Sequence, residues 1–353
     1  MYVPPIVFDR NLHHVPLPVR TADLMWAGAG LSSLYNGSTV CIPTSVYSLP
    51  MALVEQVGGW DTGPDAIGED LHMYLKCFFA TSGNLHVQIV YAAASQCNVS
   101  SDVRGITGYI DGLGARYKQA LRHMWGSLDT GYAFRQAVSM VSRRWASQNR
   151  CTDLPLSAPN ANWTAFYTSN DLHLSLAPKS QIFTPAPTQP INFWNTLTVF
   201  VRLFEAHFLP IHLVVILTTS GIFTMFQPAF LIPDVLRLAL DICGWCRLAG
   251  WLLMLCFFWR YNVYHRLCAS LRQEEMQRAG LLEDMIERDG FTMQAFRPLG
   301  ILQMGLFPIG GVIFGAIPAV QAVLSHVLTN KLTYVVSLKP QAPNAKIRRS
   351  MTP

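Results

Sequence analysis

The sequence predicts an α/β domain followed by an α-helical membrane region of two to three spans, and two observations lead to this fold class. Only 13% of the 353 residues are charged, about half the share that is usual in a soluble domain. The apolar excess is also uneven, because charged residues are absent between Glu205 and Asp234 and between Arg297 and Lys331. An apolar content of 51% excludes a disordered chain, and a net charge of only +5 argues against a nucleic-acid-binding protein.

Composition divides the chain into four parts. Residues 1–148 contain ordinary proportions of charged and turn-forming residues and form the predicted soluble domain. Residues 149–192 are rich in Pro, Ser and Asn, which indicates a linker. Residues 193–330 are the expected membrane region, and residues 331–353 form a basic tail.

Local patterns predict the elements of the soluble domain. A short helix is expected at 51–57 and is ended by Gly58-Gly59, because glycine readily takes the left-handed conformation that follows a helix. Apolar residues at helical spacing predict a second helix at 69–79. The remaining expected elements are a strand at 85–91 and helices at 115–125 and 132–148.

Three apolar segments are candidates for membrane spans. The first two are each long enough for the roughly 20 residues that cross a hydrocarbon core. The second contains Asp241 and Arg247, which could meet through water or lie at the interface. The segments cover about 206–232, 238–259 and 298–330.

The third segment and the region before it are expected to be less regular. Pro308 and Pro318 interrupt residues 298–330, which favours a kinked or re-entrant segment. Residues 265–290 are expected to form an amphipathic helix at the membrane surface. Basic residues between the second and third segments accord with an orientation in which the soluble domain faces the cytosol.

Two polar clusters in the soluble domain are candidates for chemistry. Glu69 and Asp70 lie in the first turn of a predicted helix, where acids are also common simply because the helix dipole attracts them. Gln119, Arg122 and His123 share one helical face, which could equally be a solvated surface. Both clusters occur in this order just before a membrane region, which favours the interpretation that they form a functional site.

These motifs resemble those of membrane-bound glycosyltransferase family 2, and in particular a fungal family 2-like branch. The resemblance covers the carboxyl-terminal part of the catalytic domain and the membrane spans. It implies a partial glycosyltransferase A-type fold, which is the fold of nucleotide-diphospho-sugar transferases. The residues that carry it are Gly58-Gly59-Trp60-Asp61, Gly68-Glu69-Asp70, Gln119, Arg122, His123 and Trp125.

The resemblance also implies roles for individual residues. Asp70 would be the general base that takes the proton from an acceptor hydroxyl, with Glu69 as its neighbour in the motif. Arg122 would counter the diphosphate charge of a nucleotide-sugar donor, and Trp125 would offer a ring to a sugar. The other residues implied to line the donor and acceptor site are Gln119, His123, Trp60 and Asp61.

Three departures from the family pattern affect this prediction. Gly68 replaces the threonine of the Thr-Glu-Asp motif, and His123 replaces the tryptophan of Gln-x-x-Arg-Trp. The Asp-x-Asp motif, which would hold the Mg or Mn ion that the family implies, is absent from the sequence. Glu287-x-Asp289 is the nearest substitute and is expected to be solvated, so no metal ligand is predicted.

Two functions remain open on these grounds. The first is an inverting transferase that moves sugar from a nucleotide-sugar donor to a glycan or lipid acceptor, as a truncated form or with a partner chain that supplies the missing half. The alternative is an inactive membrane scaffold or partner subunit that retains half of the fold. In either case we expect an integral membrane protein of the Golgi, endoplasmic reticulum or plasma membrane. A transporter would need more spans and more intramembrane polar residues.

Overall fold

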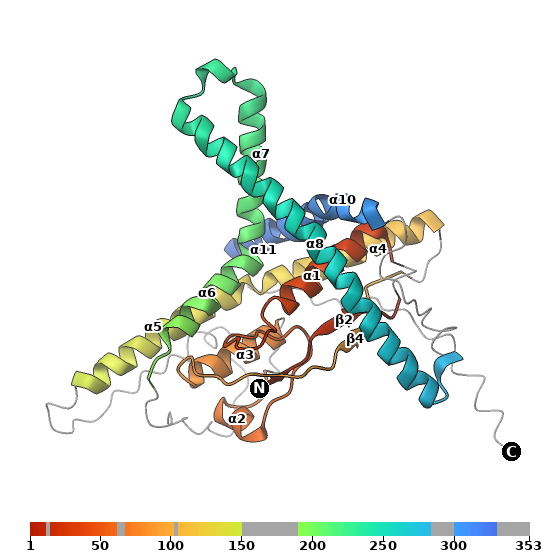
Figure 1. Ribbon diagram of the computed structural model, residues 1–353. Coiled ribbons are helices and arrows are strands. Elements are labelled where there is room, and N and C mark those ends of the chain that lie inside the picture. The colour runs from red at the N-terminus through yellow and green to blue at the C-terminus, as the bar shows by residue number, and fades with distance from the viewer. Residues whose placement is uncertain (12–14, 62–67, 102–104, 150–189, 284–299, 330–353) are drawn as a thin grey trace.

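The computed structural model describes residues 1–11, 15–61, 68–101, 105–149, 190–283 and 300–329. Within these ranges, the chain forms a mixed α/β body from which a helical hairpin projects (Figure 1). The α/β class is visible only in part, since helices dominate and the described strands are few and short. Most of the predicted linker and the basic tail lie outside the described residues.

The β-structure consists of two pairs of parallel strands. β1 (Tyr2–Val3) pairs with β3 (Gln88–Ile89), and β2 (Ile6–Phe8) pairs with β4 (Ala94–Gln96). All three residues of β2 are buried, which is typical of parallel strands covered on both faces. The strand predicted at 85–91 is shorter than expected, because only two of its residues pair with β1.

Two helices occur nearly where the sequence predicts them. α2 covers Met51–Gln56 and is followed by Gly58 and Gly59, whose φ values of 86° and 95° lie in the left-handed region. α3 covers Glu69–Ala80, and its apolar stripe packs into the main core. The later helices begin earlier than predicted, with α4 at Gly105–Trp125 and α5 at Ser127–Asn149.

Sequence patterns do not predict the first helix, α1 (Leu17–Leu31). It packs against β2 and α8 through Leu24 and Ala27, but it also buries the polar side chains of Thr21 and Asp23. Its inward face therefore mixes apolar and polar residues. As a result, α1 lacks the clear helical spacing of apolar residues by which an amphipathic helix is recognised in a sequence.

α6 (Phe193–His207) belongs to the soluble body, although composition places the start of the membrane region at residue 193. Asn192 caps the helix by accepting a hydrogen bond from the Asn195 amide at 3.0 Å. Val199 and Leu203 are almost fully buried in the core that also contains α3. The projecting part of the chain consequently begins after α6.

α7 (Leu209–Phe226) and the first half of α8 (Asp234–Arg278) form the projecting hairpin, with a short 3₁₀ turn at Ala229–Leu231 at its tip (Figure 1). Both helices are long and apolar enough to cross a membrane, and no residue of α7 is buried. This agrees with the spans predicted at about 206–232 and 238–259. The hairpin thus presents its apolar surface outward, as a membrane-embedded segment would.

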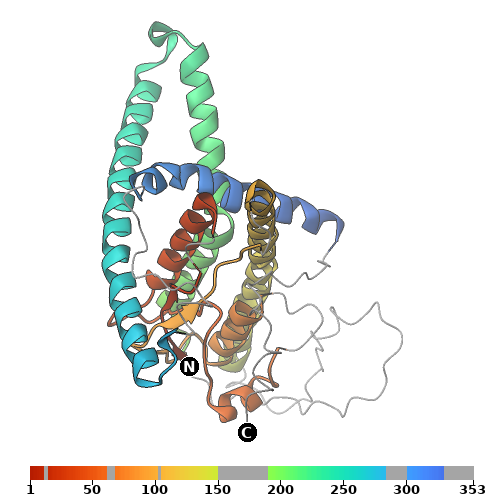
Figure 2. The same ribbon diagram turned by 90° about the vertical axis from the view of Figure 1, so that its right-hand side faces the viewer.

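α8 continues without a break from the hairpin along the side of the body (Figure 2). The helix predicted at 265–290 is present over residues 265–278, where it is the end of α8 and not a helix of its own. The lower half of α8 is fixed to β2, since the Tyr264 hydroxyl donates to the Ile6 carbonyl at 3.1 Å and Arg272 lies 3.4 Å from Asp9. One rigid helix consequently joins the hairpin to the body.

The third candidate span is a continuous helical stretch of α10 (Gly300–Gly311), a π-helical turn (Val312–Ala316) and α11 (Ile317–Leu328). The re-entrant form predicted for 298–330 is not found in the described part of this segment, which is helical throughout. The π turn precedes Pro318, whose ring would clash with a regular preceding turn. This stretch is apolar enough to span a membrane. It nevertheless lies across the base of the hairpin and not alongside the two hairpin helices (Figure 2).

α1 and α8 come into close contact at Gly28. A Cβ atom at this position would lie 2.5 Å from Phe257 Cζ. We expect Gly28→Ala to lower the free energy of unfolding by about 1–3 kcal/mol, because a close-packed contact accepts an added methyl only with strain. Gly114→Ala in α4 is the matched control, since its Cβ would meet nothing within 4 Å. The thermal unfolding midpoints of the two variants test this prediction. Equal shifts of the two midpoints would contradict the close contact at Gly28.

Candidate active site

The two predicted acids at the start of α3 are held by a loop as well as by the helix end. Asp70 Oδ2 accepts a hydrogen bond from the Ser45 amide at 2.8 Å, and its Oδ1 accepts from the Leu71 amide at 2.9 Å. Glu69 accepts a hydrogen bond from the Tyr47 hydroxyl. Ser45 adopts a φ of 65°, an uncommon conformation for a residue other than glycine, and presents its amide to Asp70. The carboxylates are therefore fixed from two sides.

The Gly-Gly-Trp-Asp loop contacts α3 and Tyr47, the residue that binds Glu69. Lys76 Nζ donates to the Gly59 carbonyl at 3.2 Å, which ties the loop to α3. The Trp60 ring is 6.1 Å from the Tyr47 ring and keeps 44% of its surface exposed. An exposed indole beside a fixed carboxylate is a surface on which a sugar ring can pack.

A histidine and a third carboxylate, which the sequence prediction did not include, lie next to this pair. His72 Nδ1 is 2.7 Å from Asp129 Oδ1, and the His72 ring packs on the Tyr132 ring at 4.5 Å. Burial raises the pKa of Asp129, and the nearby carboxylates of Asp61 and Asp70 raise it further, while His72 opposes both effects. The only sequence signal for Asp129 is an acid at the start of a helix, which is too common to mark a site.

The predicted residues on α4 are anchored by a buried ion pair. Arg116 Nε lies 2.9 Å from Asp23 Oδ1, and both side chains are at least 96% buried. The same guanidinium donates to Gln119 Oε1 at 2.8 Å. Asn98 also donates to Asp23 at 2.5 Å. Gln119 is thus linked to α1 and to the segment after β4, which gives it a fixed orientation.

His123 and Trp125 make contacts in two different parts of the body. His123 stacks on Trp26 with ring centroids 4.5 Å apart. Trp125 is 4% exposed and packs edge-on against His326 of α11. Its ring is therefore not open to a sugar in this structure, because the helix turn directs it into the α4–α11 contact. Trp60 instead supplies an exposed indole.

Burial keeps two histidines near the end of α4 neutral. Desolvation lowers the pKa of His123 well below its usual value, and Arg116 and Arg122 add to this effect. Burial also lowers the pKa of His207 to about 4. A Cβ at Gly126 would lie 3.1 Å from His207 Nε2, which places this histidine against the α4–α5 junction. The arginines of α4, and not these histidines, therefore carry positive charge in this region at neutral pH.

The start of α3 lies against the α4–α5 junction. A Cβ at Gly68, the residue before α3, would lie 3.2 Å from Asp129 Oδ2 and 4.0 Å from Gly126 Cα. The residue just before Glu69 and Asp70 therefore approaches the chain about one helical turn after Arg122. The side chains of Gln119, His123 and Trp125 make their contacts elsewhere, with Arg116, Trp26 and His326 respectively.

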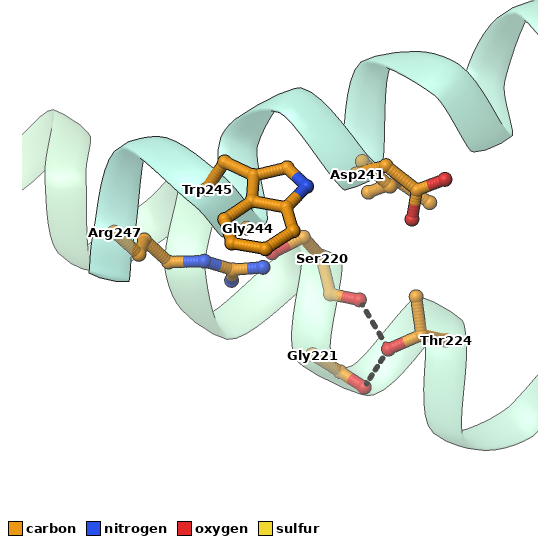
Figure 3. Close-up of a pocket in the computed structure, with 8 residues that line it drawn as sticks. Ser220, Gly221, Thr224, Asp241, Gly244, Trp245 and Arg247 are labelled. Atoms are coloured by element: carbon orange, nitrogen blue, oxygen red, sulfur yellow. Dashed lines mark hydrogen bonds between the residues drawn. The ribbon is translucent and has the colours of Figure 1, made fainter. Parts of the chain in front are cut away.

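A polar pocket of about 370 Å³ lies elsewhere, between α7 and α8 (Figure 3). Asp241 and Arg247, which the sequence suggests might meet, both line it. No ion pair joins them among the described residues. Thr224 Oγ1 instead donates to the carbonyls of Ser220 and Gly221, as hydroxyls in apolar helices commonly do.

The fold and the site define a mixed α/β body with fixed carboxylates at a helix start and an apolar helical hairpin. The family model for glycosyl transferase family group 2 matches residues 2–262. The chain belongs to this family and contains a glycosyltransferase domain. Family membership implies a nucleotide-sugar donor and an acceptor. No curated protein and no solved structure matches the chain.

The described residues do not fit the divalent cation that the family resemblance implies. Among them, no group of three His, Cys, Asp or Glu side chains is placed to hold a metal ion. The carboxylates near α3 are engaged with Ser45, Tyr47 and His72. The Glu287-x-Asp289 pair lies outside the described residues.

Proposed function

We propose that the chain is a membrane-bound, inverting glycosyltransferase that moves a sugar from a nucleotide-sugar donor to a glycan or lipid acceptor. The observation that carries the proposal is the Asp70 carboxylate, which the Ser45 amide holds at the start of α3 in a chain of this family. The exposed Trp60 indole, which lies near Tyr47 of the same loop region, supports it. A hydroxyl is a weak nucleophile until a carboxylate within hydrogen-bond reach takes its proton. In this proposal, Asp70 takes that proton.

In this proposal, each neighbouring residue has a separate task. Asp70 removes the acceptor proton as the hydroxyl attacks the anomeric carbon from the face opposite the leaving diphosphate. Arg122 compensates the negative charge that develops on that diphosphate. Gln119 is held by Arg116 and contributes hydrogen bonds, while Trp60 packs on the sugar. Tyr47 holds Glu69, which thereby stays beside the base.

The membrane arrangement that we propose follows from the directions of the helices. α7 and the upper half of α8 cross the bilayer, and α10–α11 lies along its surface at the base of the hairpin. Arg260 and Arg266 lie on the body side of α8, whereas the tip between α7 and α8 carries no charge before Asp234. Positive residues prefer the cytosolic side, which supports a cytosolic catalytic body.

Thiol labelling tests this membrane arrangement. Cys243, Cys246 and Cys256 are exposed on α8 in the absence of lipid. In intact vesicles we expect a membrane-impermeant maleimide to leave all three unlabelled, because hydrocarbon excludes the reagent and suppresses the reactive thiolate. A cysteine introduced at the exposed Asp111 of α4 is the control and should react. Peptide mass spectrometry reads each site, and equal labelling at all four would contradict the hairpin insertion.

A panel of nucleotide sugars tests the proposed activity. Membranes containing the full chain are incubated with labelled uridine- and guanosine-diphosphate sugars, and the label is followed into the glycan and lipid fractions. At least one donor should give incorporation above membranes without the chain. Absence of incorporation and of donor binding across the panel would favour the second candidate, an inactive scaffold or partner subunit, which the missing Asp-x-Asp motif supports.

A further inference from the structure

The space beside the first residue of the Gly-Glu-Asp motif is filled by a side chain from another helix. Gly68 has a φ of −105°, which any residue can adopt, so its backbone does not require glycine. A Cβ there would nevertheless approach Asp129 Oδ2 to 3.2 Å. The constraint at this position is therefore the Asp129 carboxylate, which comes from the first turn of α5.

Asp129 is held in this place by contacts on its other side. Its Oδ1 lies 2.7 Å from His72 Nδ1, and His72 packs on Tyr132. Asp129 is only 9% exposed, so its carboxylate has little freedom to move into water. The start of α3 has no side-chain cap of its own, and a negative group near exposed helix amides stabilises such an end.

We propose that Asp129 is a positioning residue which substitutes for the side chain missing at Gly68 and, held by His72, fixes the first turn of α3 against the α4–α5 junction. The inference rests on the proposed function, since the group that it positions is Asp70. Asp129 does not contact the reacting atoms in this role. It sets the position of the base relative to the segment that carries Arg122.

A double-mutant cycle between positions 68 and 129 tests the proposal. Asp129→Ala and Gly68→Thr are each expected to lower kcat about 10- to 100-fold while the KM for the donor changes little, because a small misplacement of a catalytic group has effects of this size. The double variant should recover most of the lost kcat, since threonine then fills the space and supplies an oxygen at the helix start. Asp111→Ala, an exposed acid on α4, is the matched control and should behave as wild type.

Amide hydrogen exchange at residues 69–71 provides a second readout that does not depend on turnover. Each single variant should exchange faster at these amides, and the double variant should regain protection. Additive effects of the two substitutions on kcat and exchange would overturn the proposal, as would loss of thermal stability with unchanged kcat in Asp129→Ala. If Asp70→Asn leaves turnover unchanged while the exchange coupling persists, the proposed base is wrong, but the contact between Asp129 and the helix start stands.

Discussion

Replacing Asp23 with alanine is expected to destabilise the body by about 3–5 kcal/mol, because Arg116 would be left as a buried, uncompensated charge. Both side chains lie almost entirely out of water and connect α1 with α4. The midpoint of thermal unfolding, followed by tryptophan fluorescence in detergent, should fall on the order of 10 °C. Activity should fall with it, since Arg116 also orients Gln119.

Two comparisons make this prediction specific. Glu205→Ala removes the partner of Arg202 in a largely exposed ion pair and should cost less than about 1 kcal/mol. Replacing both members of the buried pair, as Asp23→Leu with Arg116→Met, should recover much of the lost stability, since no charge then stays buried. If the buried and the exposed substitutions shift the midpoint equally, the Asp23–Arg116 contact does not have the predicted role.

Asp70→Asn is expected to lower kcat by about 100- to 10,000-fold, the usual contribution of a general base. Asparagine keeps the size of the side chain and an oxygen that can accept the Ser45 amide, so the fold and donor binding should be retained. The measurement is the rate of sugar transfer at saturating donor, together with the donor KM. A change confined to KM would indicate that Asp70 binds substrate and is not the base.

The exposed Glu55 of α2 offers the control for this substitution. Glu55→Gln removes one carboxylate from an exposed site and should leave kcat unchanged. The midpoint of thermal unfolding shows whether Asp70 also stabilises the fold through the dipole of α3. That interaction contributes no more than about 1 kcal/mol to the free energy of unfolding. A fall in kcat proportional to the loss of folded protein would assign Asp70 a structural role only.

The sequence predicts those elements whose signals are local. Gly58 and Gly59 end α2 through their own backbone conformations, and the apolar stripe of α3 follows from helical periodicity. The hairpin follows from the length of its apolar runs. Each of these features depends on residues near one another in the chain, so a pattern along the chain is enough to identify it.

The features that the sequence does not predict depend on contacts between distant segments. The periodicity of α1 is not recognisable in the sequence, because its buried face includes Asp23. This residue pairs with Arg116, which lies far from it along the chain. α8 extends beyond its span because Tyr264 and Arg272 bind the body.

The candidate site divides in the same way. Glu69 and Trp60 both contact Tyr47, whereas Trp125 packs against His326 of α11. The His72–Asp129 pair joins residues from two helices, and its sequence signal is no stronger than that of any polar pair. Three-dimensional packing therefore revises which residues belong to the site.

The most direct test of the central claim is the stoichiometry of donor turnover by the purified full chain. A bound nucleotide sugar is mixed with acceptor, and the released nucleoside diphosphate and the transferred sugar are counted in the same reaction. We predict one diphosphate released for each sugar transferred, with release that depends on the acceptor and is lost in Asp70→Asn. Donor that stays bound and intact in the presence of acceptor, or turnover that persists unchanged in Asp70→Asn, would contradict the account.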